Sequence, residues 1–330
     1  IYSPPVASRL YAYTNLAYYE AIRPAYQTTS ITNQLKGFEK LASEPNVKGF
    51  HPELAGIVAF MTVAKKLIFS KDSMSVVEES LLKEYAYIDK EISKNSIEWG
   101  NRVAKIVLDR AAKDQYKLTR GLPRYSVFEE EGKWQQTPPD YADATEPNWR
   151  MIMPLLMDSA SQFKPPPPPP YDLRKGSVYQ RELMELYETS KKLTPTQDTI
   201  AKYWDDNPFV IEHAGHMMFG NKKITPGGHW MGITAQVVKQ TNADIVKTAQ
   251  SFALTSIALF DGFISCWDEK YRSSYVRPVT VINELIDKNW APLLQTPPFP
   301  EYTSGHSTIT ASAATVLTKL YGDNFAFEDS

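Results

Sequence analysis

The chain has 330 residues, of which 42% are hydrophobic, so it is long enough for one large globular domain or two smaller ones. Its 36 basic and 38 acidic residues leave a net charge of −2, which argues against a basic field for nucleic acid. A single cysteine, Cys266, excludes an internal disulfide framework. The longest apolar run, 252–263, is shorter than the roughly 20 residues that cross a membrane, so we expect a soluble chain without a membrane span.

Apolar residues recur at helical spacing through the first part of the chain, and strand-like alternation is scarce throughout. The pattern predicts helices at 6–22, 52–70, 76–88 and 92–112. Pro4 and Pro5 suit the start of the first helix better than its interior. We therefore expect residues 1–115 to form an N-terminal helical bundle.

Residues 116–172 are rich in proline and predict a long connector with little regular structure. Its run 165–170 consists of six consecutive prolines, which favour a stiff polyproline II segment. The run is either a ligand for a proline-binding module or a strap that covers two helical halves. Aromatic residues at both ends, Phe163 and Tyr171, favour the strap.

Helical patterns resume at 178–187 and 194–204, and Thr194, Pro195 and Gln197 have the residue types of a capping box. A loop at 219–228 and a helix at 229–239 follow. We expect residues 173–330 to form a C-terminal helical bundle that carries a site. The fold class is thus all-α, with two bundles joined by the connector or merged into one integrated domain.

Segment 242–270 is the longest periodic stretch. One face places apolar or small residues at steps of three and four: Ile245, Ala249, Phe252, Ser256, Phe260, Phe263 and Trp267. Lys270 is one further step of three along the same face. We therefore expect its ammonium to point toward the core, where it needs an anionic partner.

A second cation and a helix start follow this lysine. Pro278 disfavours helical geometry at Arg277, so the arginine should lie at or just past the helix end, where its planar fork suits a tetrahedral oxyanion. Ser304, Gly305 and His306 precede a predicted helix at 307–320, whose free N–H groups and dipole attract anions. His306 would there exchange protons with the bound group. The alternative is an ordinary N-cap beside a surface histidine.

The combination of Lys270, Arg277-Pro278 and Ser304-Gly305-His306 resembles the vanadium-dependent haloperoxidases and their relatives, the type 2 phosphatidic acid phosphatases and bacterial acid phosphatases. Two of the three motifs of that superfamily match, with Thr303 in place of the usual proline. Trp267 and Phe299 beside the motifs favour the haloperoxidase branch. The third motif, Ser-Arg with a histidine six residues after the arginine, is not found after residue 306, and we expect it beyond residue 330. In the family, that arginine completes the oxyanion cage and that histidine is the ligand of vanadium.

The resemblance implies that Lys270, Arg277, Ser304 and the Gly305 N–H hold vanadate, with Trp267 and Phe299 as walls. His306 would act as acid and base, and Lys270 would polarise peroxide for attack by a halide, which gives hypohalous acid. The same residues would suit phosphate in an acid phosphatase that acts on a phosphomonoester. A non-catalytic oxyanion-binding relative is a third possibility. The family likeness also favours an extracytoplasmic location, and an oligomer is possible.

Two further groups are candidates. Relatives keep an acidic residue in the region of Asp205 and Asp206, which therefore are candidates for supporting the anion site; the alternative is a solvated helix end. His213 and His216, with His229 downstream, are a possible metal site, but no further ligand pattern supports it. We expect no metal bound directly by these histidines.

Overall fold

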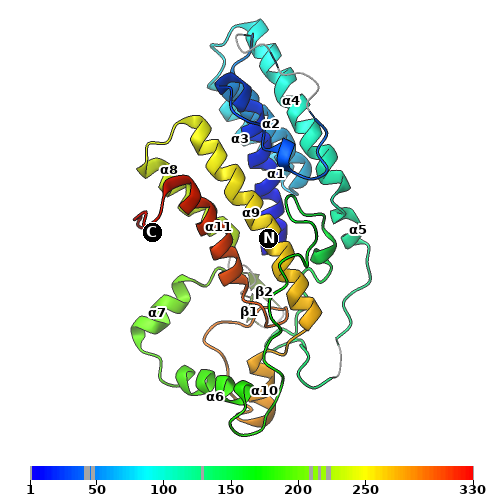
Figure 1. Ribbon diagram of the computed structural model, residues 1–330, viewed down its shortest axis with the longest axis vertical. Coiled ribbons are helices and arrows are strands. Elements are labelled where there is room, and N and C mark those ends of the chain that lie inside the picture. Colours follow the sequence, from blue (N-terminus) through cyan, green and yellow to red (C-terminus); the bar gives the residue numbers. More distant parts are fainter. Residues whose placement is uncertain are drawn as a thin grey trace.

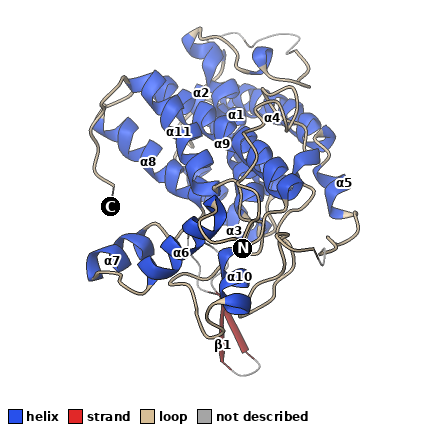
Figure 2. Ribbon diagram, turned by 60° about the horizontal axis from the view of Figure 1, so that its bottom comes forward, coloured by secondary structure: helices blue, strands red, loops and turns tan. Residues whose placement is uncertain are grey.

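The computed structural model describes residues 2–40, 45, 49–127, 130–207, 211–214, 217–220 and 224–329. Its helices and strands, with η for 3-10 helices, are α1 Pro4–Ile22, η1 Arg23–Tyr26, η2 Thr32–Gln34, α2 Pro52–Leu67, α3 Lys71–Lys83, α4 Lys90–Lys113, α5 Tyr116–Arg120, η4 Trp149–Met151, α6 Val178–Ser190, α7 Pro195–Tyr203, β1 Ile211–Ala214, β2 Met217–Gly220, α8 Pro226–Gln240, α9 Ile245–Ser273, α10 Pro278–Leu285 and α11 Gly305–Tyr321. The expected all-α class is confirmed. The two strands form one antiparallel hairpin with Ile211 opposite Gly220, drawn apart from the helices in Figure 2.

Helix α9 runs through the middle of the molecule, with α1, α2 and α4 on one side and α8 and α11 on the other (Figure 1). Tyr13 and Leu16 of α1 and Phe260 of α9 belong to one continuous buried cluster, which also includes Trp99 of α4 and Ile309 of α11. Helices from both predicted bundles therefore share a core. The division at residues 115 and 172 stays a prediction.

The predicted helices are present, although the one expected at 76–88 is shifted by five residues to Lys71–Lys83. The Thr194 side chain accepts from the Gln197 N–H, and Gln197 accepts from the Thr194 N–H, so the expected capping box is present. The expected loop at 219–228 is wrong in part, because α8 already begins at Pro226. The Thr225 side chain caps this helix by accepting from the Gly228 N–H at 3.1 Å. Gly227 and Gly228 therefore cost little helix stability, because they lie in a capped first turn that packs on Tyr11.

By length and composition, α9 is apolar enough to cross a membrane, with a mean hydropathy of 1.2 in its best window, of which 67% is buried inside the protein. The central helix of a globular core passes the same test. Its burial among α1, α8 and α11 explains the apolar composition without a bilayer.

The connector contains the short helix α5 and η4, and its other described residues are irregular. Its backbone is tied to the helical core, because the buried Asp261 carboxylate of α9 accepts from the N–H groups of Leu155, Leu156 and Met157 at 2.8, 2.8 and 3.0 Å. The proline run is also tied down. The Tyr275 hydroxyl donates to the Pro169 carbonyl at 2.6 Å, and the Tyr302 hydroxyl donates to the Pro166 carbonyl at 2.8 Å. The run therefore lies against the chain that follows α9 and precedes α11, as a strap does.

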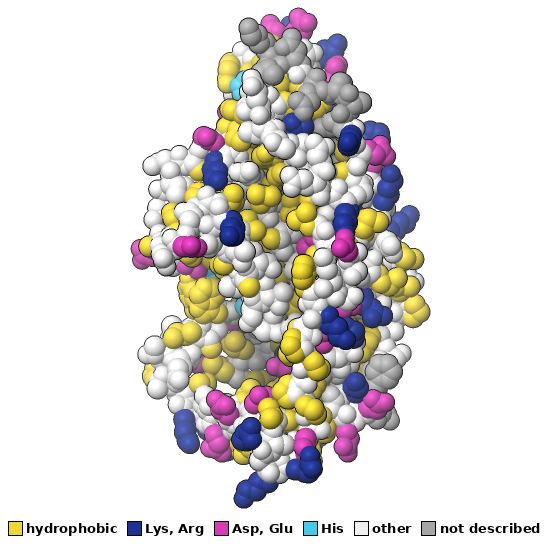
Figure 3. All heavy atoms as spheres, in the orientation of Figure 1, with side chains coloured by type: hydrophobic (Ala, Val, Ile, Leu, Met, Phe, Trp, Pro, Cys, Tyr) yellow, Lys and Arg dark blue, Asp and Glu magenta, His cyan; other side chains and the backbone are white. Residues whose placement is uncertain are grey.

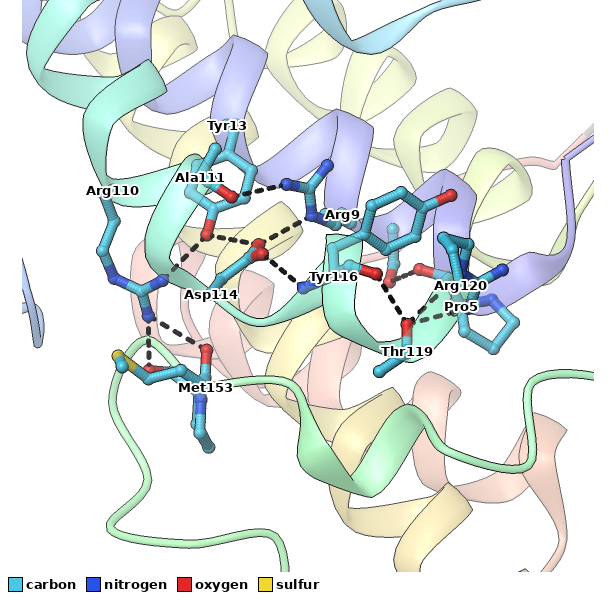
Figure 4. Close-up of polar contacts among 12 residues, drawn as sticks. Pro5, Arg9, Tyr13, Arg110, Ala111, Asp114, Tyr116, Thr119, Arg120 and Met153 are labelled. Atoms are coloured by element: carbon cyan, nitrogen blue, oxygen red, sulfur yellow. Dashed lines mark hydrogen bonds and ion pairs between the residues drawn. The ribbon is translucent and has the colours of Figure 1, made fainter. Parts of the chain in front are cut away.

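A buried polar network joins α1 to the end of α4 (Figure 4). Asp114 is fully buried and accepts from Arg9 Nε at 2.7 Å and from the Tyr13 hydroxyl at 2.9 Å, while its other oxygen accepts from the Tyr116 N–H at 2.9 Å. Arg110 donates to the Tyr13 hydroxyl at 3.1 Å and to connector carbonyls, including that of Met153 at 2.9 Å. Each of these charged groups has partners, so the network acts as a structural junction.

Candidate functional site: a cationic pocket at two helix starts

Lys270 lies in the last turn of α9 and is 1% exposed, as the stripe on this helix predicts. Its Nζ donates to the carbonyls of Pro300 and Glu301 at 2.9 and 3.0 Å, which leaves the third N–H of an ammonium for another acceptor. Burial, together with the nearby Arg277 charge, lowers the pKa of Lys270 to about 8, although Cys266 and Glu301 oppose the shift. An anion in contact with Nζ would restore the charged form.

Arg277 lies beyond the end of α9 and is the N-cap residue of α10, in extended geometry, as Pro278 predicts. Its Nε donates to the Phe299 carbonyl at 2.8 Å, and its Nη1 pairs with the Glu301 carboxylate at 2.7 Å. Its Nη2 is buried and has no hydrogen-bond partner among the described residues. Burial lowers the pKa of Arg277, although Glu301 opposes that effect.

The start of α11 provides the third part of the site. Ser304 is the N-cap, and its hydroxyl accepts from the Ser307 N–H at 3.2 Å, so the predicted helix is present but begins at Gly305, two residues before the expected start at 307. The backbone N–H groups of Gly305 and His306 lie in the first turn, where helix geometry offers them no intrahelical acceptor. The His306 side chain is exposed at this end of the helix. The start of α11 therefore brings backbone N–H donors together with a histidine side chain that can carry a proton.

These parts converge on one cavity of about 190 Å³, which we call the anion pocket. It is lined by every residue predicted to hold or enclose the anion, namely Trp267, Lys270, Arg277, Phe299, Ser304, Gly305 and His306, and also by Glu301 and Asp206. The Phe299 ring lies 4.9 Å from Lys270 Nζ and 5.0 Å from the Arg277 guanidinium, so it packs against both cations. It also contacts Trp267, with ring centroids 5.1 Å apart.

A backbone clamp fixes the two walls of the anion pocket relative to each other. The Thr145 carbonyl, in the connector, accepts from Trp267 Nε1 at 3.0 Å and from the Tyr271 hydroxyl at 2.7 Å. The Thr145 N–H donates to the Pro298 carbonyl at 2.9 Å. One connector residue therefore joins α9 to the loop that carries Phe299.

Of the two predicted acidic residues, Asp206 lines the anion pocket, whereas Asp205 lines an adjoining cavity. Asp206 is 5% exposed, and its carboxylate lies 3.0 Å from His229 Nδ1. His229 Nε2 lies 2.7 Å from a carboxylate oxygen of Asp329. Burial raises the pKa of Asp206, and the neighbouring His229 and His306 oppose that rise. The hydrogen bonds and charges of both aspartates outweigh burial and raise the pKa of His229.

Sequence reasoning missed two of these partners. His229 was considered only as a metal ligand, yet its ring is held between carboxylates and stacks on Trp204 at 5.2 Å. Within the described ranges, no cluster of three or more His, Cys, Asp or Glu side chains is arranged around a metal position, and the side chains of His213 and His216 lie outside those ranges. Glu301 was also missed, although its position three residues before Ser304 placed it next to the predicted site.

The residues present fit a tetrahedral oxyanion. The buried, unpartnered Arg277 Nη2 and the third N–H of Lys270 are donors that need acceptors, and the first turn of α11 adds backbone N–H groups. Cationic and N–H donors around this small cavity make it a candidate oxyanion-binding site in an all-helical protein.

A family model described as the VCPO second helical-bundle domain matches residues 250–330. The crystal structure of a bacterial vanadium-dependent iodoperoxidase is 44% identical, with a TM-score of 0.92, and the match covers 100% of this chain and 79% of that chain. No curated protein sequence matches. The identity and coverage show that the chain belongs to the vanadium-dependent haloperoxidase family.

Two more distant structures agree in fold. Holo-type and apo-type crystal structures of a bacterial vanadium-dependent chloroperoxidase are 17% and 16% identical, with TM-scores of 0.74 and 0.71. Each match covers 97% of this chain, and 77% and 78% of those chains. At this identity the likeness concerns the fold alone.

Proposed function

We propose that the protein is a vanadium-dependent haloperoxidase that uses peroxide to oxidise a halide to hypohalous acid. The observation that carries the proposal is the set of buried donors around the anion pocket, of which Arg277 Nη2 has no partner in the described part of the chain. The 44% identical relative is an iodoperoxidase, which makes iodide the first halide to test.

The described groups that would help to hold vanadate are Lys270, Arg277, Ser304 and the Gly305 N–H. When bound, vanadate supplies a Lewis acid that activates peroxide. Lys270 would donate its third N–H to an oxygen of the bound group and concentrate positive charge where electron density builds up. Arg277 Nη2 would donate a second charge-assisted hydrogen bond.

His306 would accept a proton from incoming hydrogen peroxide at its imidazole and return it to the departing oxygen. Asp206 lines the same pocket, where its carboxylate is held by His229. Trp267 and Phe299 would exclude water from one side, which strengthens the interactions of both cations.

The test compares iodide oxidation by hydrogen peroxide, followed as triiodide with and without vanadate, with hydrolysis of p-nitrophenyl phosphate. We expect vanadate-dependent triiodide formation, which Lys270→Met and His306→Ala each reduce at least tenfold. Lys319→Met, an exposed lysine on α11, is the matched control and should retain activity. Phosphate release without halide oxidation would instead assign the pocket to a phosphatase.

A further inference from the structure

A second cavity adjoins the anion pocket. This cavity, which we call the side chamber, has a volume of about 380 Å³ and shares five lining residues with the anion pocket: Asn207, Arg277, Pro297, Glu301 and His306. A molecule in the side chamber would therefore lie against the same His306 and Arg277 side chains that border the anion. No function assigned so far uses this space.

The walls of the side chamber are mainly apolar and partly aromatic. They include Trp204, Trp290, Leu186 and Leu293, which come from α6, the end of α7 and the loop before α11. Trp204, Leu186 and Leu293 are 46%, 41% and 41% exposed, so three large apolar side chains border one hollow. The surface between α8 and the α6–α7 segment is visibly hollowed and bordered by hydrophobic atoms (Figure 3).

The aromatic wall has a fixed orientation. Trp290 Nε1 donates to the Ser190 hydroxyl at 2.9 Å, and the Trp290 carbonyl accepts from Asn283 Nδ2 at 2.7 Å. On the other wall, Trp204 stacks on His229 at 5.2 Å. Two indoles held in place beside aliphatic side chains favour a flat, π-rich ligand over a flexible aliphatic one.

A second apolar cavity in the protein serves as a contrast. It lies among α1, α2, α3 and α9, has a volume of about 400 Å³, and includes Phe60, Met61, Val77 and Phe252 in its lining. It shares no lining residue with the anion pocket. Size and apolar character alone therefore do not single out the side chamber, whereas its continuity with the anion pocket does.

We propose that the side chamber binds an electron-rich one- or two-ring arene, of the phenol or indole class, as the organic acceptor of the oxidised halogen. This inference rests on the proposed function, which supplies hypohalous acid next to the chamber. The arene C–H bond and the halogen–oxygen bond break, a carbon–halogen bond forms, and the released proton and hydroxide leave as water. The ring is oxidised by two electrons, and the halogen is reduced from its +1 state.

The test is binding of 2-naphthol, measured by isothermal titration calorimetry without peroxide or halide. Leu293→Trp and Leu186→Trp fill the side chamber from two different walls, and each should weaken binding at least tenfold. Val77→Trp fills the other apolar cavity and is the matched control, with binding as in the wild type. All of these positions are exposed enough for the variants to fold, which circular dichroism checks.

The outcomes separate this inference from the proposed function. If both chamber variants bind 2-naphthol as the wild type does, or if Val77→Trp alone weakens binding, the side chamber is not the arene site. If binding behaves as expected but the wild type oxidises no halide, the proposed function fails while the arene site stands.

Turnover gives a second measurement. Leu293→Trp should lower the fraction of the oxidised iodide that is recovered as iodinated naphthol. Loss of naphthyl phosphate hydrolysis in both chamber variants would instead make the chamber a leaving-group site and overturn the acceptor role.

Discussion

Arg9 and Arg110 on one side of the core, and Lys270 and Arg277 on the other, are cations with little exposure to solvent, since three are buried and the Arg277 side chain is 12% exposed, but their surroundings differ. Arg9 and Arg110 lie around the fully buried Asp114, and their donors reach a carboxylate, a hydroxyl or a carbonyl (Figure 4). Lys270 donates to the main-chain carbonyls of Pro300 and Glu301, and Arg277 pairs with the partly exposed Glu301 carboxylate. One Arg277 nitrogen has no partner among the described residues. The hydrogen-bond and ion-pair partners of Arg9 and Arg110 compensate for the free energy that burying their charges costs.

The difference separates a structural cluster from a binding site. A fully satisfied network stabilises one arrangement of the chain, whereas buried donors without acceptors are stabilised when a ligand supplies them. The lowered pKa values of Lys270 and Arg277 express the same deficit, because burial disfavours their charged forms until an anion is present. Four experiments test whether this contrast holds.

The largest expected effect is on stability. Asp114→Asn removes the buried charge between Arg9 and Arg110 and should lower the free energy of unfolding by about 3–5 kcal/mol, measured by urea denaturation. Asp109→Asn is the control on the same helix, since Asp109 forms an exposed pair with Lys105 and should cost under ~1 kcal/mol. Equal costs for the two variants would remove the basis for treating the Asp114 network as a structural junction.

The next effect concerns binding. Lys270→Met should lower the affinity for sulfate, used as an inert tetrahedral dianion, at least tenfold by calorimetry. The free energy of unfolding should change by less than ~2 kcal/mol, because an ammonium desolvated at a cost is replaced by an apolar side chain of similar length. Lys319→Met is the control. A Lys270→Met protein that is severely destabilised but binds sulfate normally would place this lysine with the structural cations.

The pH dependence of sulfate binding gives a third test. The pKa of Lys270 in the folded protein, about 8, lies below its ordinary 10.5, so the folded protein loses the ammonium charge as the pH rises through 8. Sulfate keeps its charge over this range, and its affinity should therefore fall about tenfold between pH 7 and pH 9.5. From pH 8 to 10.5 the unfolded chain binds more protons than the folded one, so this lysine makes stability rise with pH. The same titration of Lys270→Met should lack the step.

The smallest effect is expected at Glu301. Glu301→Gln removes a negative charge from the anion pocket and replaces the ion pair with Arg277 Nη1 by a weaker neutral hydrogen bond, so sulfate should bind about fivefold more tightly. The gain is limited because the Glu301 side chain is 39% exposed, and exposed ion pairs contribute under ~1 kcal/mol. Glu185→Gln on the exposed face of α6 is the control. Weaker sulfate binding would mean that Glu301 orients Arg277 rather than competing with the anion.

Local signals in the sequence were sufficient for the parts of the site that one element carries. Steps of three and four along α9 predicted the buried position of Lys270, and Pro278 predicted that Arg277 would follow the helix end. A helix was expected after Ser304-Gly305-His306, and α11 begins at Gly305, two residues before the predicted position. Residue periodicity and capping are local properties, so they can be recognised in the sequence without knowledge of the tertiary fold.

Pairings between distant segments were not predictable in this way. His229 meets Asp206 across 23 positions, and the Asp114 network joins residues separated by about a hundred. The glycine-rich start of α8 was also misjudged, because the cap at Thr225 and the packing of Gly228 against Tyr11 outweigh the low helix propensity of glycine. Such contacts depend on how the chain folds back on itself, which a short stretch of sequence does not reveal.

The clamp at Thr145 has a consequence for mutational scanning. Its three hydrogen bonds, from Trp267, from Tyr271 and to Pro298, use only backbone atoms of residue 145. Nearly every side chain at this position should therefore preserve the spacing between α9 and the Phe299 loop, and a saturation library would show a tolerant position. Proline is the exception, because it lacks the N–H that reaches Pro298. A position that determines the width of the anion pocket would thus look neutral in all but one of its substitutions.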